Sequence, residues 1–115
     1  MKIIVAGGRN FNDYKLLSEK LDYFFSRLNQ IQIVCGEAKG ADSLGKKYAT
    51  EHGIEVLSFP AEWNKYGKTA GFRRNEQMAQ TADALVAFWD GESHGTKHMI
   101  DIMRQLGKPV KVVKY

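Results

Sequence analysis

The sequence has one cysteine, two prolines and no apolar run of membrane-spanning length. Cys35 alone cannot form an intramolecular disulfide, which excludes a disulfide-rich secreted framework, so we expect a reducing compartment and take the cytoplasm as the default. The apolar run that follows Met1 is too short for a signal peptide or a membrane helix. We therefore expect no membrane partner, and we interpret this run as a first strand.

Blocks of consecutive basic residues, internal repeats and low-complexity segments are also missing. The formal net charge is +4, and the basic residues are scattered, which favours an anionic small ligand over a dedicated nucleic-acid surface. Hydrophobic residues make up 43% and charged residues 26% of the chain, an ordinary globular composition. Residues 1–115 are therefore expected to form a single domain around one core.

Five short apolar runs are present, and each ends at a glycine, a proline, an aspartate or close to the last residue. They span residues 3–6, 31–35, 54–59, 84–89 and 110–113. Continuous apolar runs of this length are typical of strands that are buried on both faces of a parallel sheet.

Between these runs, apolar residues recur at spacings of three and four, which indicates helices. The clearest pattern is Tyr14, Leu17, Leu21, Phe24 and Leu28. Strands that alternate with helices form right-handed βαβ units, with helices on both faces of the sheet. The predicted fold is an α/β, Rossmann-like, three-layer α/β/α sandwich with a five-stranded parallel sheet in the order 3-2-1-4-5.

Glycine-rich polar segments follow the first, second and fourth predicted strands. In an open α/β sheet the ligand binds beyond the carboxyl ends of the strands, where these segments converge. Glycine lets the backbone approach a phosphate, and the amides at a helix start attract anions, although each glycine also fits an ordinary tight turn. The candidate ligand-binding residues here are Gly7, Gly8, Arg9, Asn10, Gly36, Gly40, Ala41, Asp42, Asp90, Gly91, Ser93, Gly95 and Thr96.

The segment from residue 60 to residue 71 is too polar for a core and is expected to form a flap. Trp63 within it either stacks on a base or packs the segment onto the sheet. Arg74 is a candidate phosphate ligand because its guanidinium can donate two hydrogen bonds at once, and Asn75 can fix its neighbours.

Taken in order, these blocks resemble the small YspA-type members of the SLOG superfamily. The resemblance is carried by the glycine loops at 7–11 and 36–42, Pro-Ala-Glu-Trp at 60–63, Ala-Gly-Phe-Arg-Arg-Asn at 70–75, and the segment 88–96. It implies a Rossmann-like domain that binds a nucleotide or nucleotide-derived ligand, similar to AMP, ADP-ribose or NAD, as a sensor or carrier. Superfamily relatives often associate through helices, so a homodimer is also expected, with the apolar residues 23–25 as core or interface.

Catalysis is a separate question, because phosphoribohydrolase relatives carry a Gly-Gly-x-Gly-Thr-x-x-Glu motif. Alignment on Gly95 and Thr96 places Met99 at the glutamate position, and a thioether cannot act as a general base. The enzyme alternative is therefore a nucleotide hydrolase or transferase whose acid or base is Asp42, Glu37, Asp90 or Glu92. A second alternative is single-stranded nucleic-acid binding through basic and aromatic side chains.

Two further patterns carry less weight. Residues 91–95 fit Gly-x-Ser-x-Gly, but no acid and histidine follow in the order that a nucleophile elbow requires. His94 and His98 have the spacing of a metal-binding pair, but His94 is expected to lie in the loop before the helix. We therefore expect neither a metal nor a required cofactor.

Overall fold

A computed structural model describes residues 1–115 as one five-stranded parallel sheet covered by helices on both faces. The strand order is β3-β2-β1-β4-β5, which confirms the predicted order and the Rossmann-like fold. The elements along the chain are β1 (Lys2–Gly7), α1 (Tyr14–Phe25), β2 (Gln32–Cys35), α2 (Ala41–Glu51), β3 (Glu55–Ser58), α3 (Trp63–Tyr66), the 3₁₀ turn η1 (Gly67–Thr69), α4 (Ala70–Thr81), β4 (Ala84–Trp89), α5 (His94–Gln105) and β5 (Val110–Lys114).

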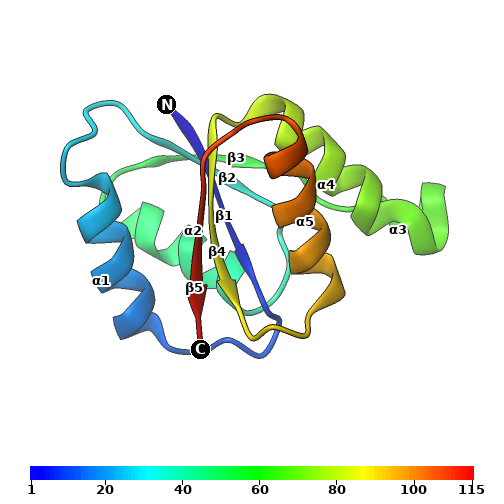
Figure 1. Cartoon of the computed structure of the whole chain (residues 1–115), viewed down its shortest axis with the longest axis horizontal. Coiled ribbons are helices and arrows are strands. Elements are labelled where there is room, and N and C mark those ends of the chain that lie inside the picture. The colour runs from blue at the N-terminus through cyan, green and yellow to red at the C-terminus, as the bar shows by residue number, and fades with distance from the viewer.

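The strand register brings the carboxyl ends of β1 and β4 to the same edge, since Gly7 pairs with Phe88. Helices α1 and α2 cover one face of the sheet, and α4 and α5 cover the other (Figure 1). None of these helices combines the length and apolar character that a bilayer crossing requires.

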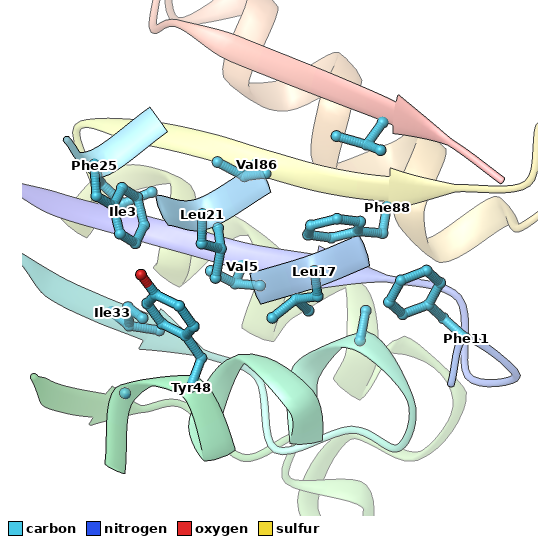
Figure 2. Close-up of a cluster of buried hydrophobic side chains, with 13 residues drawn as sticks. Ile3, Val5, Phe11, Leu17, Leu21, Phe25, Ile33, Tyr48, Val86 and Phe88 are labelled. Carbon is cyan, nitrogen blue, oxygen red and sulfur yellow. The ribbon is translucent and has the colours of Figure 1, made fainter. Parts of the chain in front are cut away.

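A cluster of 13 buried residues packs α1 and α2 against the sheet. Figure 2 shows Phe11 beside Phe88 at one end of this cluster and Tyr48 beside Ile33 at the other. A second cluster of 11 buried residues, rich in methionine and alanine, lies under α4 and α5. The sheet is thus buried between two separate apolar layers, as its continuous apolar strands require.

Two local expectations need correction, and the segment expected to form a flap has secondary structure of its own. The apolar pattern that extended to Leu28 ends as a helix at Phe25, and Phe25 is buried whereas Phe24 is only partly buried. β3 is an edge strand, so Glu55 and Ser58 at its ends are exposed rather than buried on both faces. The expected flap contains the short helix α3 and the turn η1, which lead directly into α4.

Candidate functional site

The carboxyl edge of the sheet is hollowed into a first cavity of about 470 Å³. Its walls come from the segments after β1 and β4 and from the facing sides of α2, α4 and α5. It brings together eleven of the predicted residues: Gly7, Gly8, Arg9, Asn10, Asp42, Arg74, Asn75, Asp90, Ser93, Gly95 and Thr96.

A second cavity of about 480 Å³ lies beside the first, between the segment after β2 and the start of α3. Gly36 and Trp63 line this second cavity, and Trp63 is 52% exposed. The two cavities share four wall residues, which are Arg9, Asn10, Ala38 and Arg74. Two arginines therefore stand at the junction of two adjoining hollows.

Three predicted residues, Gly40, Ala41 and Gly91, line neither cavity. Gly40 has a φ of +76°, and a Cβ at this position would lie 2.2 Å from the carbonyl oxygen of Gly8. The same carbonyl accepts a hydrogen bond from the Ala41 amide at 3.3 Å. Gly40 and Ala41 thus hold the segments after β1 and β2 in direct backbone contact, which only glycine permits at residue 40.

The start of α5 is fixed by side chains from its own loop. Asp90 Oδ1 accepts hydrogen bonds from the Glu92 and Ser93 amides, both at 2.9 Å, and these bonds lower the pKa of Asp90. Ser93 Oγ accepts from the Thr96 amide at 3.4 Å. The amide of Ser93, one of the candidate ligand-binding residues, is therefore already engaged, whereas the His94 and Gly95 amides make no hydrogen bond within the protein.

Asp42 is a buried carboxyl in the wall of the first cavity, with 5% of its surface exposed. Burial raises its pKa to about 6, because the charged form is poorly solvated there. The nearby Arg74 guanidinium and a hydrogen bond from the Ala38 amide, at 3.4 Å, offset part of this rise. Asp42 therefore titrates well above the usual pKa of an aspartate, beside Arg74.

Arg74 is held from both sides of its guanidinium. Its Nη1 donates to the carbonyl oxygen of Gly36, and its Nε donates to Asn75 Oδ1 at 3.1 Å. Asn75 Nδ2 in turn contacts the Gly95 carbonyl oxygen and His98 Nδ1, both at 3.2 Å. The buried Asn75 amide thus fixes Arg74 relative to the first turn of α5, and it does this across two helices.

The two further sequence patterns, the Gly-x-Ser-x-Gly segment and the histidine pair, have structural roles. His94 is the first residue of α5 rather than a loop residue, so that expectation was wrong, and no group of three or more potential metal-ligating side chains comes together. Ser93 is the N-cap of α5 rather than the apex of a nucleophile elbow. Met99 is buried, and its side chain belongs both to the core and to the wall of the first cavity.

Sequence reasoning missed Ala6, Ala38, Met78 and Tyr115 among the residues that line the first cavity. Tyr115 packs edge-on against Phe11, with ring centroids 4.7 Å apart, and its hydroxyl covers the backbone of Gly8. The available signal was its place directly after β5, since that strand ends at the same edge as β1 and β4. Ala38 carries no chemical signal in its side chain, and the contact that ties it to the site is its backbone amide, which donates to Asp42 Oδ2 at 3.4 Å.

Comparison with known proteins gives two matches. Residues 1–66, which are more than half of the chain, match the family described as "YspA, cpYpsA-related SLOG family". Over 116 aligned residues the chain is 30% identical to the Gene 61 protein of Mycobacterium phage D29, and the alignment covers 95% of this chain and 93% of that protein. No solved structure matches.

Proposed function

Because the chain belongs to the YspA, cpYpsA-related SLOG family, we propose that it binds a nucleotide or nucleotide-derived ligand at the carboxyl edge of its sheet, as a sensor or carrier. One observation carries this proposal: Arg9 and Arg74 line both cavities at their junction. A phosphate group bound there would meet two guanidinium groups, which are the side chains best suited to forked hydrogen bonding with phosphate.

The charge balance at this junction supports an anionic ligand. Neither arginine forms a salt bridge with a carboxylate. The pKa of Arg74 is lowered by burial, the nearby Asp42 carboxyl offsets part of this lowering, and the positive charge of Arg9 adds a smaller lowering. A bound phosphate would relieve the repulsion between the two cations and replace the solvation that Arg74 has lost.

The backbone supplies further donors close to the two arginines. Gly95 lines the first cavity, and its amide at the start of α5 is free for a ligand oxygen. The positive end of the α5 dipole favours negative charge at that point. Trp63 in the second cavity offers an exposed aromatic face on which a base can stack.

Calorimetry and native mass spectrometry with AMP, ADP, NAD, ADP-ribose and cyclic nucleotides test the proposal. We expect at least one of them to bind with a dissociation constant below about 1 mM. Arg9→Gln is the informative variant because Arg9 is exposed and its loss leaves the core intact. Arg27→Gln, just beyond the C-terminal end of α1, removes the same charge and serves as the control. If no nucleotide binds, or if both variants weaken binding equally, the proposal is wrong.

A second function, nucleotide hydrolysis, is favoured by Asp42 alone. A cavity-lining carboxyl with a pKa near 6 is partly protonated at neutral pH, as a general acid requires. We would then expect release of free base from a nucleotide, and loss of this release in Asp42→Asn. Binding without any release of base excludes this function and leaves the binding role in place.

A further inference from the structure

His98 lies where α4 and α5 pack side by side on one face of the sheet (Figure 1). Its ring is partly buried, and the Phe72 ring packs edge-on against it, with ring centroids 4.5 Å apart. Its Nδ1 is 3.2 Å from Nδ2 of the buried Asn75, while its Nε2 has no hydrogen-bond partner within the protein. Because His98 lines neither cavity, its influence on a ligand must pass through Asn75.

The hydrogen bonds of Asn75 fix the direction in which its amide faces. Its Oδ1 accepts from Arg74 Nε, and an arginine nitrogen can only donate. Its Nδ2 donates to the Gly95 carbonyl oxygen, which can only accept. Nδ2 therefore also presents a hydrogen to His98, and Nδ1 of His98 must accept it. His98 is accordingly neutral, and its ring proton is on Nε2.

A second proton on His98 goes to Nδ1, which is the nitrogen that Asn75 contacts. The imidazolium ion donates at both nitrogens, so Nδ1 and Asn75 Nδ2 become two donors that face each other. Rotation of the Asn75 amide relieves this contact, but it places the amide nitrogen against Arg74 Nε and the amide oxygen against the Gly95 carbonyl oxygen. Protonation of His98 is therefore incompatible with the arrangement that holds Arg74.

On this basis, and resting on the proposed function, we infer that His98 is a positioning residue for Arg74, that it acts through Asn75, and that its protonation weakens ligand binding. Neutral His98 keeps the Arg74 guanidinium aligned at the junction of the two cavities. Protonated His98 leaves Arg74 Nε without its acceptor, so the guanidinium retains only the bond from Nη1 to the Gly36 carbonyl oxygen. A phosphate group must then order the arginine as it binds, which costs affinity.

The surroundings of His98 favour the neutral ring at neutral pH. Burial lowers the pKa of His98, and the negative charges of Glu76 on α4 and Asp101 on α5 offset part of this lowering. Asp101 is itself paired with Lys97 at 2.7 Å. The strands beneath α5 contribute no charge to this balance. The hydrogen bonds from His98 to Arg74 should thus be intact at neutral pH and should open as the pH falls below 6.5, the ordinary pKa of histidine.

Nuclear magnetic resonance of the ligand-free protein tests this chain of hydrogen bonds. Long-range ¹H–¹⁵N correlation should show the ring proton of His98 on Nε2 at about pH 8. On acidification, the Nε–H signal of Arg74 should shift with the same midpoint as the His98 ring. Asp42 also titrates beside Arg74, so His98→Asn, which has no ring to titrate, isolates the shift that comes from His98. A proton on Nδ1 at about pH 8, or the same Arg74 shift in His98→Asn, would contradict the inference.

Two substitutions separate the acceptor at residue 98 from its charge. Asparagine places an oxygen close to the position of Nδ1 and cannot titrate, whereas leucine removes the acceptor. We measure affinity by calorimetry for the tightest ligand among AMP, ADP, NAD, ADP-ribose and cyclic nucleotides. At about pH 8, His98→Leu should bind about fivefold more weakly than the wild type, and His98→Asn should restore most of this loss. At about pH 5, the wild type should approach His98→Leu, and His98→Asn should bind about fivefold more tightly than both.

Comparison of the variants at the same pH cancels the titration of Asp42 and of the ligand phosphate, which all the proteins share. His94→Asn is the matched control, because His94 is exposed one turn earlier on α5, and this variant should keep the wild-type pH profile. If a nucleotide binds and the wild type, His98→Asn and His98→Leu share one pH profile, the inference is wrong and the proposed function stands. If no nucleotide binds at either pH, both are wrong.

Discussion

The two faces of the sheet are packed with different side chains, and only one of them continues into the cavities. The face under α1 and α2 is filled by large aromatic and branched residues such as Phe88 and Leu17. The face under α4 and α5 is filled mainly by methionine and alanine, and its Met78 and Met99 also line the first cavity. The comparison indicates that the first face contributes mostly to stability, whereas the second combines stability with the shape of the site.

The largest expected effect tests the first face. Leu17→Ala removes a fully buried side chain of α1 and should lower the free energy of unfolding by about 3–4 kcal/mol. Ligand affinity of the folded variant should stay unchanged, because Leu17 lines no cavity at the carboxyl edge. Urea denaturation and calorimetry measure the two quantities. Leu106→Ala, at a half-exposed residue after α5, provides a control with little loss of stability.

The free energy of unfolding should depend on pH because of Asp42, which lies in the wall of the first cavity at the carboxyl edge of the sheet. Its pKa is raised from 3.8 to about 6 by burial, so the native state binds more protons than the unfolded state between these values. Stability should therefore fall as the pH rises from about 4 to about 6, by up to about 3 kcal/mol. Asp42→Asn should remove this slope, as urea unfolding at a series of pH values would show. A variant with the same slope as the wild type would assign the effect to another group.

The contact between the segments after β1 and β2 is tested by a pair of glycines that both have a positive φ. Gly40 and Gly53 have φ angles of +76° and +66°, but only Gly40 would place a Cβ against another backbone. We expect Gly40→Ala to cost about 2 kcal/mol and Gly53→Ala about 1 kcal/mol in thermal unfolding. Only the Gly40 variant should also weaken nucleotide binding. Equal losses of stability in the two variants would mean that backbone strain, and not the close approach to Gly8, explains why residue 40 must be glycine.

The smallest effect on stability is expected at Met99, on the second face. Met99→Leu keeps the buried volume and should change the free energy of unfolding by less than about 1.5 kcal/mol. Because Met99 also lines the first cavity, ligand affinity should change by more than stability does. Met103→Leu, which is equally buried but lines no cavity, is the matched control. The same change of affinity in both variants would remove the distinction between the two faces.

The sequence predicts the fold well because its strands are short, uniformly apolar runs that end at glycine, proline or aspartate. The carboxyl-edge rule then places Arg9, Asp42 and Ser93 at one site before any coordinates are known. The predictions are weakest where one local pattern has two outcomes. α3 is only four residues long, too short to show a helical period, and Phe24 and Phe25 are both apolar enough to extend a helix face.

Individual roles within the site were harder to predict than its location. Whether an amide is free or engaged depends on side chains such as Asp90, which occupies two amides of its own loop. The bridge from Arg74 through Asn75 to α5 joins residues that lie 20 or more positions apart, and no local pattern encodes it. Two adjoining cavities in place of one are likewise a property of the packed chain.

Amide chemical-shift mapping tests the central claim most directly. Titration of the isotope-labelled protein with ADP-ribose and AMP should shift the backbone amide signals of Gly8, Arg9 and Gly95. The signals of residues 26–30, at the opposite edge of the sheet, should remain unchanged. Shifts confined to that opposite edge, or no shift at Gly8, Arg9 and Gly95 at millimolar ligand, would contradict a nucleotide site built on Arg9 and Arg74.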